Sequence, residues 1–120
     1  MNELRLGIVE ARFADIVWQN APITTRNLVA ICEKELEWKR TTTYTVLKKL
    51  CERGIFVTEN STVKAKLTKE DFYAIQSEKF VEDTFSGSLP AFIAAFASRK
   101  RPSEAELEEI RRIIDEFGEK

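Results

Sequence analysis

The fold of this chain is decided by residues 40–54, which read RTTTYTVLKKLCERG. Apolar side chains recur there every three or four residues, which predicts a helix over 40–53 that ends at Gly54. The positions expected to face a core are Thr43, Val46, Leu47, Leu50 and Cys51. The opposite face is polar and carries Thr41, Thr42, Thr45, Lys48, Lys49 and Glu52. Threonine is a mediocre helix former, so a run of threonines indicates a role on the helix surface.

Two further helices are predicted upstream. Residues 8–20 carry a helical apolar pattern, which Ala21-Pro22 ends because the residue before a proline avoids helical backbone. Thr24 is placed as the N-cap of a helix that runs to about Glu35, and Trp38 lies in a short extended link. The expected inward positions are Ile8, Val9, Phe13, Ile16, Val17 and Trp18 in the first helix and Leu28, Ile31, Cys32 and Leu36 in the second.

Downstream of Gly54 the pattern changes from helical to alternating. Apolar and polar residues alternate at Ile55 and Val57 and again at Val63, Ala65 and Leu67, which predicts two strands. Residues 59–62 read ENST and form the turn between them. Three helices followed by a hairpin is the element order of a winged helix-turn-helix, which presents its third helix and its hairpin to DNA.

Three more helices are predicted after the hairpin. One covers about 69–85, a short one follows Pro90, and the last opens at the capping box Ser103–Glu106. Their apolar faces need a cover, which is either a satellite core on the winged helix or a second copy; we favour a two-fold dimer. The residues assigned to dimerisation are Phe72, Phe80, Phe92, Phe96, Leu107, Ile110, Ile114 and Phe117.

We therefore predict a mainly α protein with a small β hairpin. An N-terminal winged helix-turn-helix domain covers residues 1–68, and a helical dimerisation region covers residues 69–120. The net charge of −1 conceals an asymmetry, because residues 1–69 hold twelve Lys and Arg against eight Asp and Glu, while residues 70–120 hold seven against twelve. A local basic stripe suits a module that meets phosphate with one face, although a solvated helix face gives the same pattern.

Residues 39–53 concentrate this excess, with five cations against Glu52. Threonine hydroxyls and methyls can contact base edges, whereas basic side chains hold phosphates without reading sequence. The residues assigned to DNA binding are Arg40, Thr41, Thr42, Thr45, Lys48, Lys49, Lys64 and Lys66. The alternative is a winged helix that serves as a protein-interaction module without sequence-specific DNA binding, which the acidic isoelectric point of about 5.7 favours.

Several classes of protein are disfavoured by what the sequence lacks. It contains no histidine, no CxxC and no glycine-rich phosphate loop, so we expect no enzyme, no cofactor and no metal site. Cys32 and Cys51 are too few for a disulfide framework and are interpreted as packed core thiols. Residues 1–12 carry charges of both signs and no apolar signal region, and no apolar run could span a bilayer, so we expect a cytoplasmic protein.

Over residues 6–117 the chain resembles the penicillinase and methicillin-resistance repressors (the BlaI/MecI/CopY type). The landmarks lie in register along the whole chain: Trp18 with Ala-Pro-Ile-Thr at 21–24, Leu36-Glu-Trp38, Thr42, Thr45, Leu47, Leu50, Gly54, Gly87-Ser88-Leu89 and Ser103-Glu104. The resemblance implies a homodimeric repressor whose winged helix binds a promoter dyad with TACA and TGTA half-sites and blocks transcription. It places Thr41, Thr42, Thr45 and Lys48 on the recognition helix, with Arg40 and Lys49 beside them on phosphate.

The chain departs from this family pattern at three places. The family wing usually carries Gly-Arg where this chain has Ser61-Thr62, which leaves Lys64 and Lys66 for the wing contact. In the β-lactam members a membrane sensor protease signals and the repressor is cut between Asn and Phe; the aligned pair here is Ala95-Phe96, so that partner is not carried over with the resemblance. No cysteine follows Cys51, which excludes the C-terminal copper motif of the copper-responsive branch.

Overall fold

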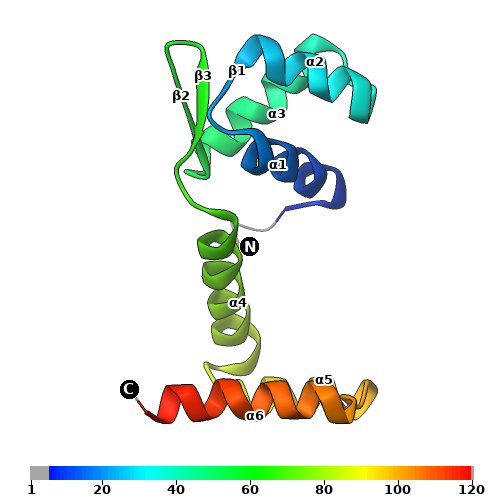
Figure 1. Cartoon of the computed structure of the whole chain (residues 1–120), viewed down its shortest axis with the longest axis vertical. Coiled ribbons are helices and arrows are strands. Elements are labelled where there is room, and N and C mark those ends of the chain that lie inside the picture. Colours follow the sequence, from blue (N-terminus) through cyan, green and yellow to red (C-terminus); the bar gives the residue numbers. More distant parts are fainter. Residues whose placement is uncertain (1–5, 120) are drawn as a thin grey trace. The chain divides into compact units, whose positions relative to one another are not determined.

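The structure, a computed structural model, describes residues 6–119 and contains six helices and three short strands within that range. The helices are α1 (Ile8–Asn20), α2 (Thr25–Leu36), α3 (Arg40–Glu52), α4 (Lys69–Phe85), α5 (Leu89–Arg99) and α6 (Glu104–Gly118), and the strands are β1 (Ile23–Thr24), β2 (Phe56–Glu59) and β3 (Thr62–Ala65) (Figure 1). The mainly helical winged helix-turn-helix fold with a small β hairpin is thus confirmed. The first five residues of the stretch examined for a signal peptide lie outside the described residues.

The chain divides into two compact units, residues 1–79 and residues 80–120, and α4 runs across the boundary between them. Our prediction placed the domain boundary between residues 68 and 69, before α4 rather than within it. The two-domain limits stay a prediction, because compactness alone does not show which segments fold independently. Each unit is described by itself below.

Side chains that the sequence marks as caps fix where the helices begin. The Thr24 hydroxyl accepts a hydrogen bond from the Asn27 amide at 3.2 Å, which starts α2. At α6 the capping box is complete, because Ser103 accepts from the Glu106 amide while the Glu106 carboxylate accepts from the Ser103 amide. Gly54 follows α3 with φ +83°, a left-handed conformation that glycine adopts without steric cost.

The wing is a three-stranded antiparallel sheet in the order β1-β3-β2. Glu59 pairs with Thr62 across a two-residue turn in which Asn60 and Ser61 both have positive φ, as tight hairpins require. The hairpin was predicted, but β1 was not, because a two-residue strand leaves no alternating pattern. Ile23 of β1 pairs with Val63 of β3, which joins the start of α2 to the β2–β3 hairpin.

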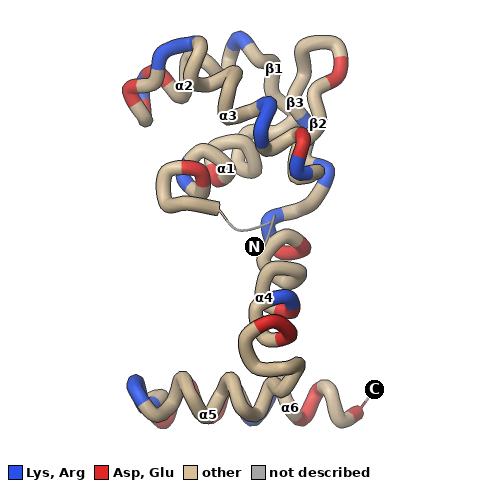
Figure 2. The backbone as a smooth tube through the Cα atoms, turned by 180° about the vertical axis from the view of Figure 1, so that it is seen from behind, with Lys and Arg blue, Asp and Glu red and all other residues tan. Residues whose placement is uncertain are grey.

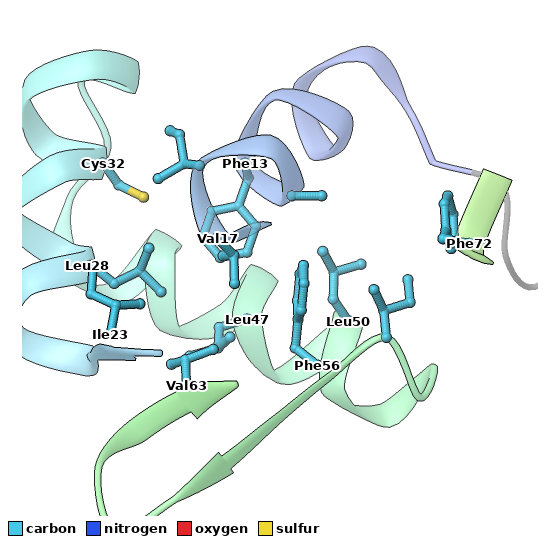
Figure 3. Packing of buried hydrophobic residues seen from close by; sticks show 13 residues of the cluster. Phe13, Val17, Ile23, Leu28, Cys32, Leu47, Leu50, Phe56, Val63 and Phe72 are labelled. Carbon is cyan, nitrogen blue, oxygen red and sulfur yellow. The ribbon is translucent and has the colours of Figure 1, made fainter. Parts of the chain in front are cut away.

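The core of the first unit collects one face of each surrounding element (Figure 3). Figure 3 labels Phe13 and Val17 from α1, Leu28 and Cys32 from α2, Leu47 and Leu50 from α3, Phe56 and Val63 from the hairpin, and Phe72 from α4. Trp18 closes the edge: its indole N–H donates to the Leu67 carbonyl at 2.9 Å, and its ring lies 5.5 Å from that of Phe56 and 5.6 Å from that of Phe72.

Some expected inward positions differ in the structure. Ile8 and Val9 are 84% and 50% exposed, because they occupy the first turn of α1, before the helix meets the core. In the hairpin, Ile55 and Phe56 are buried while Val57 is half-buried and Ala65 is exposed, so the alternation that we assigned to Ile55 and Val57 was wrong. The shift arises because Ile55 precedes β2 and packs from the turn after α3.

Phe72 belongs to the core of the first unit rather than to a free surface. It is fully buried, and its ring contacts Trp18 and Tyr73. The cause is a contact between distant segments: Lys69 pairs with Asp15 of α1 at 2.9 Å, which anchors the first turn of α4. Phe72 is therefore not available to a second copy in this structure, and our assignment of Phe72 to dimerisation is corrected.

The second unit is held together by phenylalanine rings and has little buried interior. Ring centroids of Phe80, Phe85 and Phe92 lie 5.6–6.0 Å apart in a mutual edge-to-face cluster, and Phe96 lies 6.5 Å from Phe92. Neither α5 nor α6 contributes a buried residue. Among the described residues, none of the helices is both long and apolar enough to cross a membrane.

Candidate nucleic-acid interface

Helix α3 turns one face into the core and leaves the opposite face open to solvent. Thr43, Leu47 and Leu50 are buried, at 1%, 4% and 0% exposure. The exposed positions are Arg40, Thr41, Thr42, Tyr44, Thr45, Lys48, Lys49 and Glu52. At 3.6 residues a turn, Thr41, Thr45, Lys48 and Glu52 form the centre of this face. All the α3 residues assigned to DNA binding are exposed, so the structure leaves each of them accessible.

Two threonine hydroxyls of α3 donate hydrogen bonds to backbone carbonyls four residues earlier. The Thr45 hydroxyl donates a hydrogen bond to the Thr41 carbonyl oxygen at 2.9 Å, one turn back along α3. Its lone pairs and its methyl group therefore remain for an external partner. Thr43, which we placed on the core side, donates in the same way to Lys39 at 3.5 Å.

Tyr44 is a surface residue that the sequence reasoning missed. The guanidinium carbon of Arg40 lies 5.5 Å from the centre of the Tyr44 ring, a distance typical of a cation–π contact. A hydrogen bond from Thr25 at the start of α2, with a smaller contribution from Arg40, lowers the pKa of the Tyr44 hydroxyl. Tyr44 thus connects α2 to α3, and its ring packs against the Arg40 guanidinium. A tyrosine among threonines on a polar helix face was the available signal.

Tyr44 also lines two cavities on the edge of α3. One, of about 510 Å³, is lined by Thr24, Thr25, Arg26, Val29, Arg40, Tyr44 and Ser61. The other, of about 410 Å³, is lined by Thr25, Tyr44, Leu47, Lys48, Cys51, Phe56, Val57, Thr58 and Lys66. Each cavity combines two basic side chains with hydroxyl groups, a combination suited to a phosphate group. Arg26 and Ser61 join the candidate site here, although we had not assigned them to it.

The two wing lysines that we assigned together lie in different places. Lys66 shares the cavity of Lys48, beside α3. Lys64 pairs with Glu59 at 3.5 Å and lines a separate cavity with Trp18 and Lys69. Of the assigned cations, the structure therefore brings Arg40, Lys48 and Lys66 together around Tyr44, and it leaves Lys64 apart from them.

Lys49 lies on the edge of α3 that faces α1 and is paired there with a carboxylate. Its ammonium is 2.8 Å from the Glu10 carboxylate, and the Arg53 guanidinium lies 3.9 Å from the same group. Glu10 also accepts a hydrogen bond from the Gly7 amide at 3.1 Å. The hydrogen bond with Lys49 and that with Gly7 lower the pKa of the Glu10 carboxyl, which keeps it ionised. The pair was not visible in the sequence because the two residues are far apart along the chain.

The distribution of charge follows these contacts. Figure 2 shows basic segments on α3, both basic and acidic segments on the β2–β3 hairpin, and acidic segments on α6. The cysteines take no part in the charged surface: Cys32 is buried, which raises the pKa of its thiol, and Cys51 is half-buried with its sulfur 3.6 Å from the Thr58 hydroxyl. Within residues 6–119 no group of His, Cys, Asp and Glu side chains is placed to hold a metal ion.

The model of the penicillinase repressor family matches residues 6–116 of this chain. The chain belongs to the penicillinase repressor family. Its recognition from the landmarks between Trp18 and Ser103 is thereby confirmed, and the family is one of transcriptional repressors rather than enzymes.

Two curated relatives are similar to this chain over nearly their whole length. The methicillin resistance regulatory protein MecI of Staphylococcus aureus (strain Mu50 / ATCC 700699) is 20% identical, over 92% of this chain and 93% of the relative. A penicillinase repressor of Staphylococcus aureus is 21% identical, over 98% of this chain and 97% of the relative. The agreement thus includes the winged helix and the C-terminal helices, not a single motif.

Proposed function

We propose that this protein is a homodimeric transcriptional repressor that binds a palindromic operator through α3 and the β2–β3 hairpin, in the cytoplasm, where the operator DNA lies. The observation that carries the proposal is the exposed face of α3, with short polar side chains at its N-terminal half and cations beside them. Membership of a repressor family supports it.

The N-terminal half of α3 is suited to reading bases. Thr41, Thr42 and Thr45 are exposed and short enough for the helix to enter the major groove closely. Because the Thr45 hydroxyl donates to the Thr41 carbonyl, Thr45 offers DNA its methyl group and its oxygen lone pairs. A threonine methyl can pack on a thymine methyl, and the oxygen can accept from an amino group of a base.

The cations around Tyr44 are suited to holding the sugar-phosphate backbone. Arg26 and Arg40 line one cavity, and Lys48 and Lys66 line the other. Such contacts orient the protein and contribute affinity without reading sequence. We assign the backbone contacts to these four residues. Lys64, which is paired with Glu59, is left as a secondary wing contact.

The exposed apolar side chains of the second unit support a dimer. Phe96, Ile114 and Phe117 are 55%, 55% and 65% exposed, although all three are large and apolar. Burial of such a face by a second copy would give an isologous two-fold interface and two recognition helices for one palindrome. The dimerisation set becomes Phe80, Phe92, Phe96, Leu107, Ile110, Ile114 and Phe117, to which the exposure of Leu89, Ile93 and Ile113 adds three members.

The proposal is tested by the stoichiometry and salt dependence of DNA binding. Sedimentation of the full chain with a labelled duplex should give two chains per duplex. The logarithm of the affinity should fall linearly and steeply with the logarithm of the salt concentration, as counterions are released from phosphates. Absence of binding to any duplex at low salt would overturn the proposal and favour a winged helix that binds another protein.

A further inference from the structure

The carboxylate of Glu10 in α1 lies against the basic C-terminal half of α3. It is 2.8 Å from the Lys49 ammonium and 3.9 Å from the Arg53 guanidinium. The Glu10 side chain is 20% exposed whereas that of Lys49 is 53% exposed, so the carboxylate is held in place while the lysine reaches it from solvent. The Gly7 amide fixes the carboxylate further with a hydrogen bond of 3.1 Å.

Because of this contact, the two edges of α3 differ in whether their cations are paired with a carboxylate. On the edge toward α2 and the hairpin, Arg40, Lys48 and Lys66 line cavities whose linings include no carboxylate. On the edge toward α1, the Lys49 ammonium is paired with the Glu10 carboxylate. A phosphate that approached the Lys49 ammonium would lie beside a carboxylate that is ionised and held in place by the Gly7 amide, so repulsion from Glu10 would offset its attraction to Lys49.

We infer that Glu10 withholds Lys49 from DNA and thereby limits the affinity of the protein for the phosphate backbone. The inference rests on the proposed DNA-binding function, and it replaces the sequence-based assignment of Lys49 to a phosphate. Phosphate contacts carry no sequence information, so the effect applies equally to operator and to unrelated DNA. Glu10 would therefore set how strongly the repressor binds DNA of any sequence. The ratio of its affinity for the operator to its affinity for unrelated DNA would not change.

The test compares four forms of the full chain: wild type, Glu10→Gln, Lys49→Ala and the double variant. Glutamine keeps an oxygen for the Gly7 amide, which preserves the start of α1. Anisotropy titrations use an arbitrary duplex of mixed sequence over a series of salt concentrations. Glu10→Gln should bind about threefold to tenfold more tightly, with a salt slope steeper by about one for each bound protomer.

The lysine variants show whether the gain passes through Lys49. Lys49→Ala alone should change the affinity by less than about twofold, since the wild-type lysine makes no phosphate contact. In the Glu10→Gln background the same substitution should remove most of the gain. Loss of affinity on Lys49→Ala in the wild-type background, equal to that caused by Lys48→Ala, would overturn the inference. So would a full gain from Glu10→Gln in the absence of Lys49.

A matched control removes the same charge from the same helix. Asp15 of α1 pairs with Lys69 at 2.9 Å, and Lys69 belongs to α4 rather than α3. Asp15→Asn should leave affinity and salt slope within about twofold of wild type. An equal gain there would assign the effect to net charge and contradict a role for Glu10. If the wild type binds no duplex, the proposed function fails and the inference fails with it; if the wild type binds and Glu10→Gln binds no better, only the inference fails.

Discussion

Trp18 and Leu67 are joined by a hydrogen bond of 2.9 Å from the indole N–H to the carbonyl oxygen, which links the end of α1 to the segment after the wing. The same indole ring packs against Phe56, Phe72 and Tyr73. The hairpin and α4 therefore both contact α1 through the side chain of Trp18. The contact therefore holds the hairpin against α1, because Phe56 belongs to β2.

Trp18→Phe should destabilise the protein by about 2 kcal/mol, from the lost hydrogen bond, an unpaired Leu67 carbonyl and reduced packing. Urea unfolding followed by circular dichroism measures this change. Trp38→Phe is the comparison, since a phenylalanine can keep the stack on Phe13, whose ring lies 5.5 Å away. A loss for Trp18→Phe no greater than that for Trp38→Phe would show that the link to Leu67 contributes nothing.

Thr42→Ala and Lys48→Ala should weaken DNA binding in distinguishable ways. Thr42→Ala should cost about 1–3 kcal/mol on the operator and relax its sequence preference, as expected for a base contact. Lys48→Ala should weaken operator and unrelated DNA alike and flatten the salt slope by about one per protomer. Titration of both variants against an operator and a scrambled duplex separates the two patterns. Wild-type affinity in both variants would remove α3 from the interface.

Substitutions of Tyr44 should show whether its ring or its hydroxyl matters. Tyr44→Phe keeps the ring under Arg40 and loses the bond to Thr25, so we expect DNA affinity within about threefold of wild type. Tyr44→Ala removes the support of Arg40 and should cost about 1 kcal/mol or more in DNA binding. Anisotropy titration of both variants on one duplex measures the two affinities. Equal losses would assign the effect to the hydroxyl bond with α2.

Ile114→Glu should separate the proposed dimer from the fold of the first unit. Ile114 is 55% exposed, so a charge there is tolerated by a monomer but not by an apolar interface. Sedimentation velocity should show a monomer, while tryptophan fluorescence should show an intact first unit, because Trp18 and Trp38 both lie in residues 1–79. Unfolding of that unit by Ile114→Glu would favour a satellite core over a dimer surface.

The ion pair of Glu10 should make a pH-dependent contribution to stability. Its hydrogen bond with Lys49 lowers the pKa of the Glu10 carboxyl in the folded state, so the ionised form stabilises the fold at pH values above the ordinary glutamate pKa of about 4.3. This contribution is lost as the pH falls through the lowered folded pKa. Urea unfolding of wild type and Glu10→Gln should therefore show a stability difference that is constant near neutrality and shrinks in acid. A difference that persists unchanged to pH ~3 would contradict the assignment.

The sequence predicted correctly those features of the fold that depend on local residue patterns. The ends of α1, α2 and α4, the capping box of α6 and the polar face of α3 follow from spacing and cap residues. The features that the sequence did not predict correctly depend on contacts between distant segments. Strand β1 exists because Ile23 meets Val63, and Phe72 is buried because α4 returns to α1.

In the candidate site, too, local features could be predicted from the sequence and tertiary contacts could not. Exposure of Thr41, Thr42 and Lys48 follows from the helical period alone. The pairing of Lys49 with Glu10 and the support of Arg40 by Tyr44 are tertiary contacts, and no residue count along α3 indicates them. A basic residue on a recognition helix therefore counts as a phosphate contact only once its neighbours from other helices are known.

The most direct test of the account is the cost of scrambling one half of a palindrome. Anisotropy of a ~30 bp duplex carrying the TACA/TGTA dyad is compared at ~0.15 M salt with the same duplex in which one half-site, or both, is scrambled. A dimeric repressor should bind the intact dyad at least ~100-fold more tightly than the fully scrambled duplex, and loss of one half-site should remove most of that preference. Equal affinity for all three duplexes would contradict operator recognition by paired α3 helices.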